Sequence, residues 1–121
     1  MKGVILFAHG SRDALWRRPV EAVARRIAGA QPQMAVRCAY LELCEPDLPT
    51  AAAELRAAGV RELTVLPMFL GTGKHAREDL PLLLEELRAA HPQMTLHLLP
   101  AVGEDPRMLD LMADIALGKA R

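Results

Sequence analysis

The sequence predicts an α/β protein in which a four-stranded parallel sheet is packed between two layers of helices. Four apolar runs of strand length alternate with four helical patterns, and turn residues separate them. The first and third runs are apolar almost without alternation, as expected for parallel strands buried on both faces. Because crossovers between parallel strands are right-handed, this order gives a three-layer sandwich. The four runs are residues 3–8, 35–41, 63–69 and 95–99.

In the first half of the chain, each predicted strand is followed by a helix. Strand 3–8 leads into a helix with apolar residues at positions i, i+3, i+4 and i+7. These residues are Val20, Val23, Ala24 and Ile27. Strand 35–41 leads into an alanine-rich helix over about residues 47–58, and Gly59 just beyond it suits a C-terminal cap.

The second half of the chain repeats this order. Strand 63–69 leads into a helix that is expected to begin near Asp79, because Pro81 is tolerated in a first turn. Strand 95–99 leads into the last helix, for which Asp105 and Pro106 are suited to the N-cap and the first turn. The two apolar helix faces consist of Leu80, Leu83, Leu84 and Leu87, and of Leu109, Met112, Ala113 and Ala116.

The strand order 2-1-3-4, a flavodoxin-like arrangement, is expected because it puts the first and third strands side by side. Residues 1–121 are expected to form a single domain, since no linker, low-complexity segment or internal repeat interrupts the pattern. In open parallel sheets, ligands bind beyond the carboxyl ends of the strands. The residues that follow the strands are therefore the candidates for function.

The composition narrows the possible functions. Fifteen Lys and Arg residues balance fifteen Asp and Glu residues, so nucleic acid is not an expected partner. No apolar stretch is long enough to span a bilayer and no secretory cleavage pattern follows the first strand. A cytoplasmic protein without a membrane partner is expected, and its two cysteines, Cys38 and Cys44, are expected to be reduced.

Three residues of metal-ligating type follow the first three strands. His9 comes directly after the first strand, Glu42 after the second, and His75 ends the loop after the third. Two imidazoles and a carboxylate suit a divalent transition metal and leave coordination positions open, which is needed if the metal is passed on. A structural interpretation is also open, in which His9 caps a turn, Glu42 is solvated and His75 begins a helix.

Basic residues and glycines accompany this candidate site. Arg12, Lys74 and Arg77 are expected at the same edge, either binding carboxylates of an acidic ligand or serving as ordinary surface charges. Gly10 and Gly71 give the two loops backbone freedom.

The same loops contain a hydroxyl and two large apolar residues. Ser11 is expected to cap the turn into the first helix, while Phe69 and Leu70 either end the core or line an apolar floor of the site. The glycine-rich segment 71–74 lacks the spacing of a phosphate-binding loop, and the sequence has no GxSxG elbow.

These motifs together resemble those of the short-form sirohydrochlorin cobaltochelatases, the CbiX-like class II chelatases. The resemblance rests on residues 8–12 (AHGSR), 40–42 (YLE) and 67–75 (PMFLGTGKH), with Pro46 and Asp79 close behind the second and third. It covers nearly the whole chain, and the third motif is the most specific. It implies a chelatase-like fold and an enzyme that inserts a divalent metal into sirohydrochlorin without ATP or an organic cofactor.

The resemblance also implies roles for single residues. His9 and His75 match the metal-binding and proton-accepting histidines, and Glu42 matches the acidic residue of the active site. The residues expected to bind the acidic tetrapyrrole are Arg12, Ser11, Lys74, Arg77, Gly10, Phe69, Leu70 and Gly71. Longer relatives contain two such domains in tandem, so a homodimer is expected.

The sequence leaves open which metal is inserted and whether the protein is an enzyme or a carrier. The family implies Co²⁺, the metal of the cobalamin pathway. Imidazole and carboxylate ligands do not select cobalt, so an iron or nickel chelatase remains an alternative. A non-catalytic carrier of metal or tetrapyrrole is the alternative from a different class.

Overall fold

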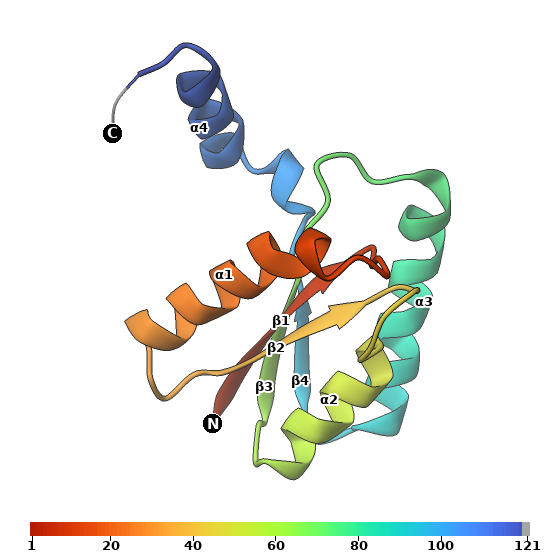
Figure 1. Cartoon of the computed structure of the whole chain (residues 1–121). Helices are drawn as coiled ribbons and strands as arrows, with labels where there is room; N and C mark the ends of the chain where they lie inside the picture. The colour runs from red at the N-terminus through yellow and green to blue at the C-terminus, as the bar shows by residue number, and fades with distance from the viewer. Residues whose placement is uncertain (120–121) are drawn as a thin grey trace.

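The computed structural model describes residues 1–119, which form an open parallel sheet with helices on both faces (Figure 1). The strand order is β2-β1-β3-β4, which confirms the predicted order 2-1-3-4. The elements are β1 (Lys2–Ala8), α1 (Ala14–Ala30), β2 (Ala35–Tyr40), α2 (Leu48–Ala57), β3 (Glu62–Pro67), α3 (Lys74–Ala90), β4 (Thr95–Leu98), the short helix η1 (Val102–Glu104) and α4 (Pro106–Ala116).

The central strand β1 explains why the first apolar run hardly alternates. It pairs with β2 on one side and β3 on the other, and helices cover both of its faces. Ile5, Leu6, Phe7 and Ala8 are therefore almost completely buried. Successive side chains point to opposite faces, so these residues divide between two hydrophobic clusters.

The two faces of the sheet are covered to different extents (Figure 1). On one face, α2 packs on β1 and β2, and α3 packs on β4; their Leu55 and Leu84 belong to the larger cluster. On the other face, α1 packs on β1 and β2, and Val20 belongs to the smaller cluster. The predicted three-layer architecture is confirmed. The last helix, α4, stands away from the sheet and its main contact is with η1.

Aspartate side chains cap three of the helices. Asp47 accepts the backbone N–H of Thr50 at the start of α2. Hydrogen bonds from the side chain and the backbone of Thr50 lower the pKa of the Asp47 carboxyl group. Asp105 accepts the backbone N–H of Arg107 and binds its guanidinium group, which lowers the pKa of Asp105 to about 2. The expected cap of α4 is thus confirmed, as are the predicted limits of α2.

Replacing Asp47 with alanine is expected to destabilise the fold by about 1 kcal/mol, because the first turn of α2 loses its side-chain acceptor. Thermal unfolding followed by circular dichroism should show a decrease in Tm of about 4 °C. Glu54→Ala, on an exposed position of the same helix, is the matched control and should leave Tm nearly unchanged. Equal Tm values for the two variants would contradict a capping role.

Ser11 caps the turn into the first helix, as predicted. Its hydroxyl accepts the backbone N–H of Asp13 at 3.0 Å. The N-cap of α1 itself is Asp13, whose carboxylate accepts the backbone N–H of Leu15.

The third helix begins earlier than predicted. It starts at Lys74 instead of near Asp79, so Pro81 lies in its interior. A proline there removes one helical hydrogen bond, the one that the carbonyl group of Arg77 would accept. Because Pro81 is exposed, water can bond to that carbonyl group. α1 contains an exposed interior proline as well, Pro19.

The ends of three strands also differ slightly from the prediction. β2, β3 and β4 end one or two residues before positions 41, 69 and 99. Among residues 1–119, no helix is both long and apolar enough to cross a bilayer.

Candidate functional site

The carboxyl ends of β1 and β2 bring two of the predicted site residues into contact. Nε2 of His9 lies 3.0 Å from Oε1 of Glu42, a hydrogen-bond distance, although the residues are 33 positions apart in the chain. Each side chain is 56% exposed, so the pair is open to a ligand from solution. The structure therefore unites His9 and Glu42 as the topology predicted.

Backbone hydrogen bonds fix this pair in place. The pairing of β1 with β2 continues past the strand ends, because Leu41 donates its N–H to the carbonyl oxygen of Ala8 at 2.9 Å. Glu42 likewise donates its N–H to the carbonyl oxygen of His9 at 3.1 Å. The two side chains thus extend from neighbouring, hydrogen-bonded backbones, which limits the freedom of each.

Gly10 permits the close approach of the two loops. Its φ angle is +106°, a conformation that favours glycine. A Cβ atom at this position would overlap the backbone carbonyl group of Glu42. The requirement for glycine after His9 is therefore both conformational and steric.

The loop after β3 lies beside the same edge. Met68 donates its N–H to the carbonyl oxygen of Phe7 at 2.7 Å, so the chain stays paired with β1 beyond Pro67. Phe69 is buried in the core, with its ring centroid 6.1 Å from that of Phe7. Leu70 is exposed. Of the two candidates for an apolar floor, only Leu70 presents its side chain to solvent.

A fourth loop, which sequence reasoning missed, supports this third one. Gly103 in η1 donates its N–H to the carbonyl oxygen of Phe69 at 2.9 Å, and a Cβ atom on Gly103 would overlap the backbone of Leu70. The predicted strand order could have identified this loop. Because β4 ends at the same edge as the other strands, the loop that follows it belongs to the site region.

His75 lies at this edge but does not join the pair. It is the second residue of α3 and is exposed. Over residues 1–119, no three His, Cys, Asp or Glu side chains are grouped closely enough to hold a metal ion. The structure thus contains two of the three predicted ligands as a pair and the third at a distance, so a three-residue metal site stays a prediction.

The basic residues lie at or before the starts of the two helices that follow β1 and β3. Arg12 precedes α1, while Lys74 and Arg77 form part of the first turn of α3, and all three are exposed. Gly71, also exposed, lies in the loop between Leu70 and α3. All four residues are open to a ligand from solution, and their contact with a ligand at the pair stays a prediction.

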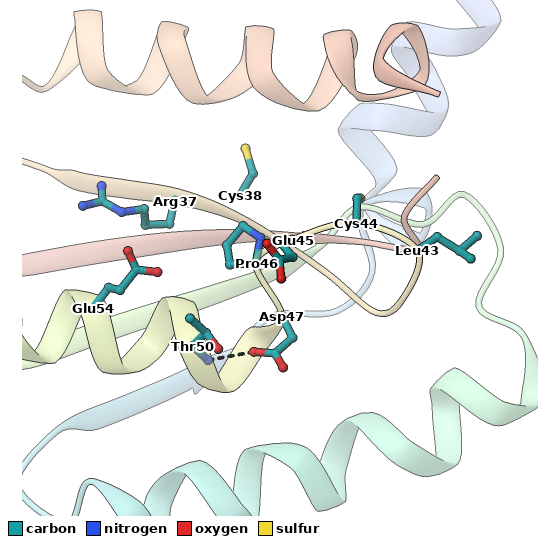
Figure 2. A pocket seen from close by; sticks show the side chains of 9 residues that line it. All are labelled: Arg37, Cys38, Leu43, Cys44, Glu45, Pro46, Asp47, Thr50 and Glu54. Carbon is teal, nitrogen blue, oxygen red and sulfur yellow. Dashed lines mark hydrogen bonds between the residues drawn. The ribbon is translucent and has the colours of Figure 1, made fainter. Parts of the chain in front are cut away.

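A hollow of about 770 Å³ lies elsewhere, beside the free edge of β2 (Figure 2). Figure 2 shows Asp47 hydrogen-bonded to Thr50 there, with the sulfur atom of Cys38 pointing toward α1. Burial raises the pKa of the Cys38 thiol, which keeps it protonated and a poor metal ligand. Glu45, Asp47 and Glu54 outnumber Arg37, so this hollow does not suit an anionic ligand. The strand-end site is the better candidate for function.

The comparisons with known proteins agree with this fold. The family model CbiX matches residues 3–116. A structure described as a putative cobalamin biosynthesis CbiX protein from Marinobacter aquaeolei VT8 superimposes with a TM-score of 0.83 at 36% identity, over 98% of this chain and 96% of that one. The sirohydrochlorin chelatase SirB from Bacillus subtilis subspecies spizizenii, solved in complex with cobalt, shares the fold with a TM-score of 0.77 at 23% identity. This chain corresponds to 51% of it.

Two curated relatives of this chain have the same name. "Sirohydrochlorin cobaltochelatase" of Methanopyrus kandleri is 34% identical over 69% of this chain and 59% of that protein. The protein of the same name from Sulfolobus acidocaldarius is 26% identical over 96% of this chain and 90% of its own length. The first of these alignments spans less than two thirds of the relative.

The open four-stranded parallel sheet of order 2-1-3-4 gives this chain the fold of its structural neighbours, a chelatase-like α/β domain. Since the family model covers nearly all of the chain, this protein belongs to the CbiX family.

Proposed function

We propose that this protein is a sirohydrochlorin chelatase that inserts a divalent metal, Co²⁺, into the tetrapyrrole without ATP. The observation that carries the proposal is the exposed His9–Glu42 hydrogen bond at the strand-end edge of a CbiX-family domain. The names of the relatives support the same substrate. Residues 1–121 act in this proposal as one chelatase domain in the cytoplasm.

The hydrogen bond assigns a role to each nitrogen atom of His9. When neutral, the imidazole donates Nε2–H to the Glu42 carboxylate, which leaves the lone pair on Nδ1. Metal insertion requires the macrocycle to lose two pyrrole protons while one dication enters. Nδ1 accepts such a proton, and the neighbouring carboxylate stabilises the imidazolium ion that results. Because both side chains are half-exposed, the proton then passes to solvent.

His75 and the basic residues complete the proposed machinery. His75, at the start of α3, is the second group for holding the incoming metal or accepting a proton. The family resemblance implies a substrate with eight carboxylates, and the exposed residues Arg12, Lys74 and Arg77 supply cations for them. A neutral chain thereby offers a locally basic rim to an acidic ring.

The proposed enzyme is a homodimer. The site is an open sheet edge, whereas binding sites commonly bury most of a ligand. A second copy facing this edge would enclose the macrocycle.

The proposal is tested by incubating the purified protein with sirohydrochlorin and with Co²⁺, Fe²⁺ or Ni²⁺ in turn. Metal insertion is followed by absorbance and compared with the uncatalysed rate. We expect acceleration with all metals that imidazole and carboxylate ligands accept. The largest acceleration is expected with Co²⁺, because the relatives are named cobaltochelatases. A larger effect with Fe²⁺ or Ni²⁺ would assign the protein to another pathway. Binding without acceleration by any metal would contradict the enzyme and favour a carrier.

A further inference from the structure

Leu43, the residue after Glu42, has an uncommon backbone conformation. Its φ angle is +69°, and among residues 1–119 it is the one residue other than glycine with a positive φ angle. In this left-handed conformation the Cβ atom of an L-residue lies too close to the following carbonyl oxygen. Glycine, asparagine and aspartate adopt it more readily than leucine does. A leucine held in this conformation is a candidate for a function, because strained residues cluster at binding and active sites.

Contacts on both sides of Leu43 hold the loop in this conformation. On the side of Glu42, Leu41 packs against the larger hydrophobic cluster. On the other side, Cys44 packs against the smaller cluster, and the carbonyl oxygen of Pro46 accepts the backbone N–H of Tyr40 at 2.9 Å. The chain between these contacts has little freedom, so the fold itself determines where the Leu43 side chain lies.

The Leu43 side chain is open to solvent. It is 49% exposed, so it gains only part of the stabilisation that a buried leucine provides. Figure 2 shows it at one end of the hollow beside β2, where it points away from the other labelled residues. Packing within the chain therefore does not explain why a leucine, and not glycine or asparagine, occupies this strained position.

Leu43 lies next to the His9–Glu42 pair. Consecutive Cα atoms are about 3.8 Å apart, and a tetrapyrrole is several times wider than this distance. A macrocycle placed over the pair extends past Glu42 in every direction within its plane, so it reaches the side chain that follows Glu42. A second leucine, Leu70, follows β3 at the same edge of the sheet and is 66% exposed. The loops after β2 and β3 thus each present an apolar side chain to solvent.

We infer that Leu43 is a substrate-binding residue of this site and packs against the apolar ring system of the tetrapyrrole. The substrate combines a flat, conjugated ring with carboxylates around it, so its site needs apolar contacts for the ring as well as cations for the carboxylates. Glu42 then acts on the metal or the protons, while the residue after it holds the ring. This inference rests on the proposed function and adds to it a residue that the sequence motifs do not single out.

Equilibrium binding of metal-free sirohydrochlorin to the full chain tests this role. Trp16 is the only tryptophan of the sequence, and its ring centroid lies 6.4 Å from that of Tyr40, close to Leu43 in the chain. Tryptophan emission overlaps the absorption of a tetrapyrrole, so the bound ligand quenches Trp16 and a titration gives Kd. Leu43→Asn removes the apolar contact but accepts the positive φ angle. We expect its Kd to rise about tenfold or more, as when a pocket loses an apolar group, with Tm unchanged or higher.

Leu43→Met is the matched control, because an apolar side chain of similar volume keeps the contact. Its Kd should stay close to that of the wild type. Kinetics then separate contact with the substrate from a role in shaping the loop. In Leu43→Asn, KM should rise with Kd while kcat stays near the wild-type value, since Glu42 keeps its place. A wild-type Kd for Leu43→Asn, a loss of kcat alone, or equally weak binding by Leu43→Met would each overturn the inference.

The binding titration does not depend on metal insertion. If the wild-type protein binds sirohydrochlorin but accelerates insertion of no metal, the proposed activity fails, and the comparison of Kd values still decides the role of Leu43. If the wild-type protein does not bind sirohydrochlorin, the inference about Leu43 is overturned as well.

Discussion

Replacing His9 with alanine is expected to slow metal insertion by about 10²–10⁴-fold, the range that general acid–base groups contribute. The His9 side chain is half-exposed, and the structure shows its ring hydrogen-bonded to Glu42. Because the ring does not belong to the core, the fold should remain intact. The rate of absorbance change with sirohydrochlorin and Co²⁺ measures the effect, and thermal unfolding confirms the fold.

A matched histidine serves as the control. His91 ends α3 at the opposite edge of the sheet, where its backbone N–H caps the helix. His91→Ala should retain nearly full activity, because the capping hydrogen bond involves only the backbone. His75→Ala should lose most activity, like His9→Ala. A double variant lacking His9 and His75 that still accelerates insertion would refute the site assignment.

Replacing Gly10 with alanine is expected to remove most activity and to destabilise the protein. The positive φ angle alone costs a non-glycine residue about 1–3 kcal/mol. The added Cβ atom would also overlap the carbonyl group of Glu42, so the loops after β1 and β2 must separate. Separation breaks the backbone hydrogen bond between Glu42 and His9 and moves their side chains apart. Activity and Tm should therefore fall together.

A second glycine of the site region gives the control. Gly71 is exposed, and no neighbouring atom lies within 4 Å of the position that an added Cβ atom would occupy. Gly71→Ala should leave Tm nearly unchanged. If Gly10→Ala retains wild-type activity, the close approach of the two loops does not position the catalytic pair.

The sequence was sufficient to predict the sheet and the neighbours within it. The apolar run of residues 3–8 hardly alternates, which predicted that β1 is buried on both faces. The order 2-1-3-4 was predicted because it places β1 beside β3, and the structure has this order. That order put His9 next to Glu42, because residues following adjacent parallel strands share an edge. These predictions depend on the hydrophobic pattern of whole strands and helices. Many residues contribute to that pattern, so a single exception does not change the result.

Predictions that depended on a single residue were less accurate. Pro81 was expected to mark the first turn of α3, yet a proline on an exposed helix face can be accommodated in the interior. The distance of His75 from the pair could not be predicted either, because it depends on the path of a loop that no strand pairing constrains beyond Met68.

The central position of β1 has a consequence for how the chain acquires its structure during synthesis. β1 is made first, but both of its neighbours are needed to bury it, and the second of them, β3, ends at Pro67. Little more than half of the chain must therefore leave the ribosome before the innermost strand is paired on both sides, and until then its apolar residues depend on transient contacts. The last helix, α4, is made too late to contribute to that step.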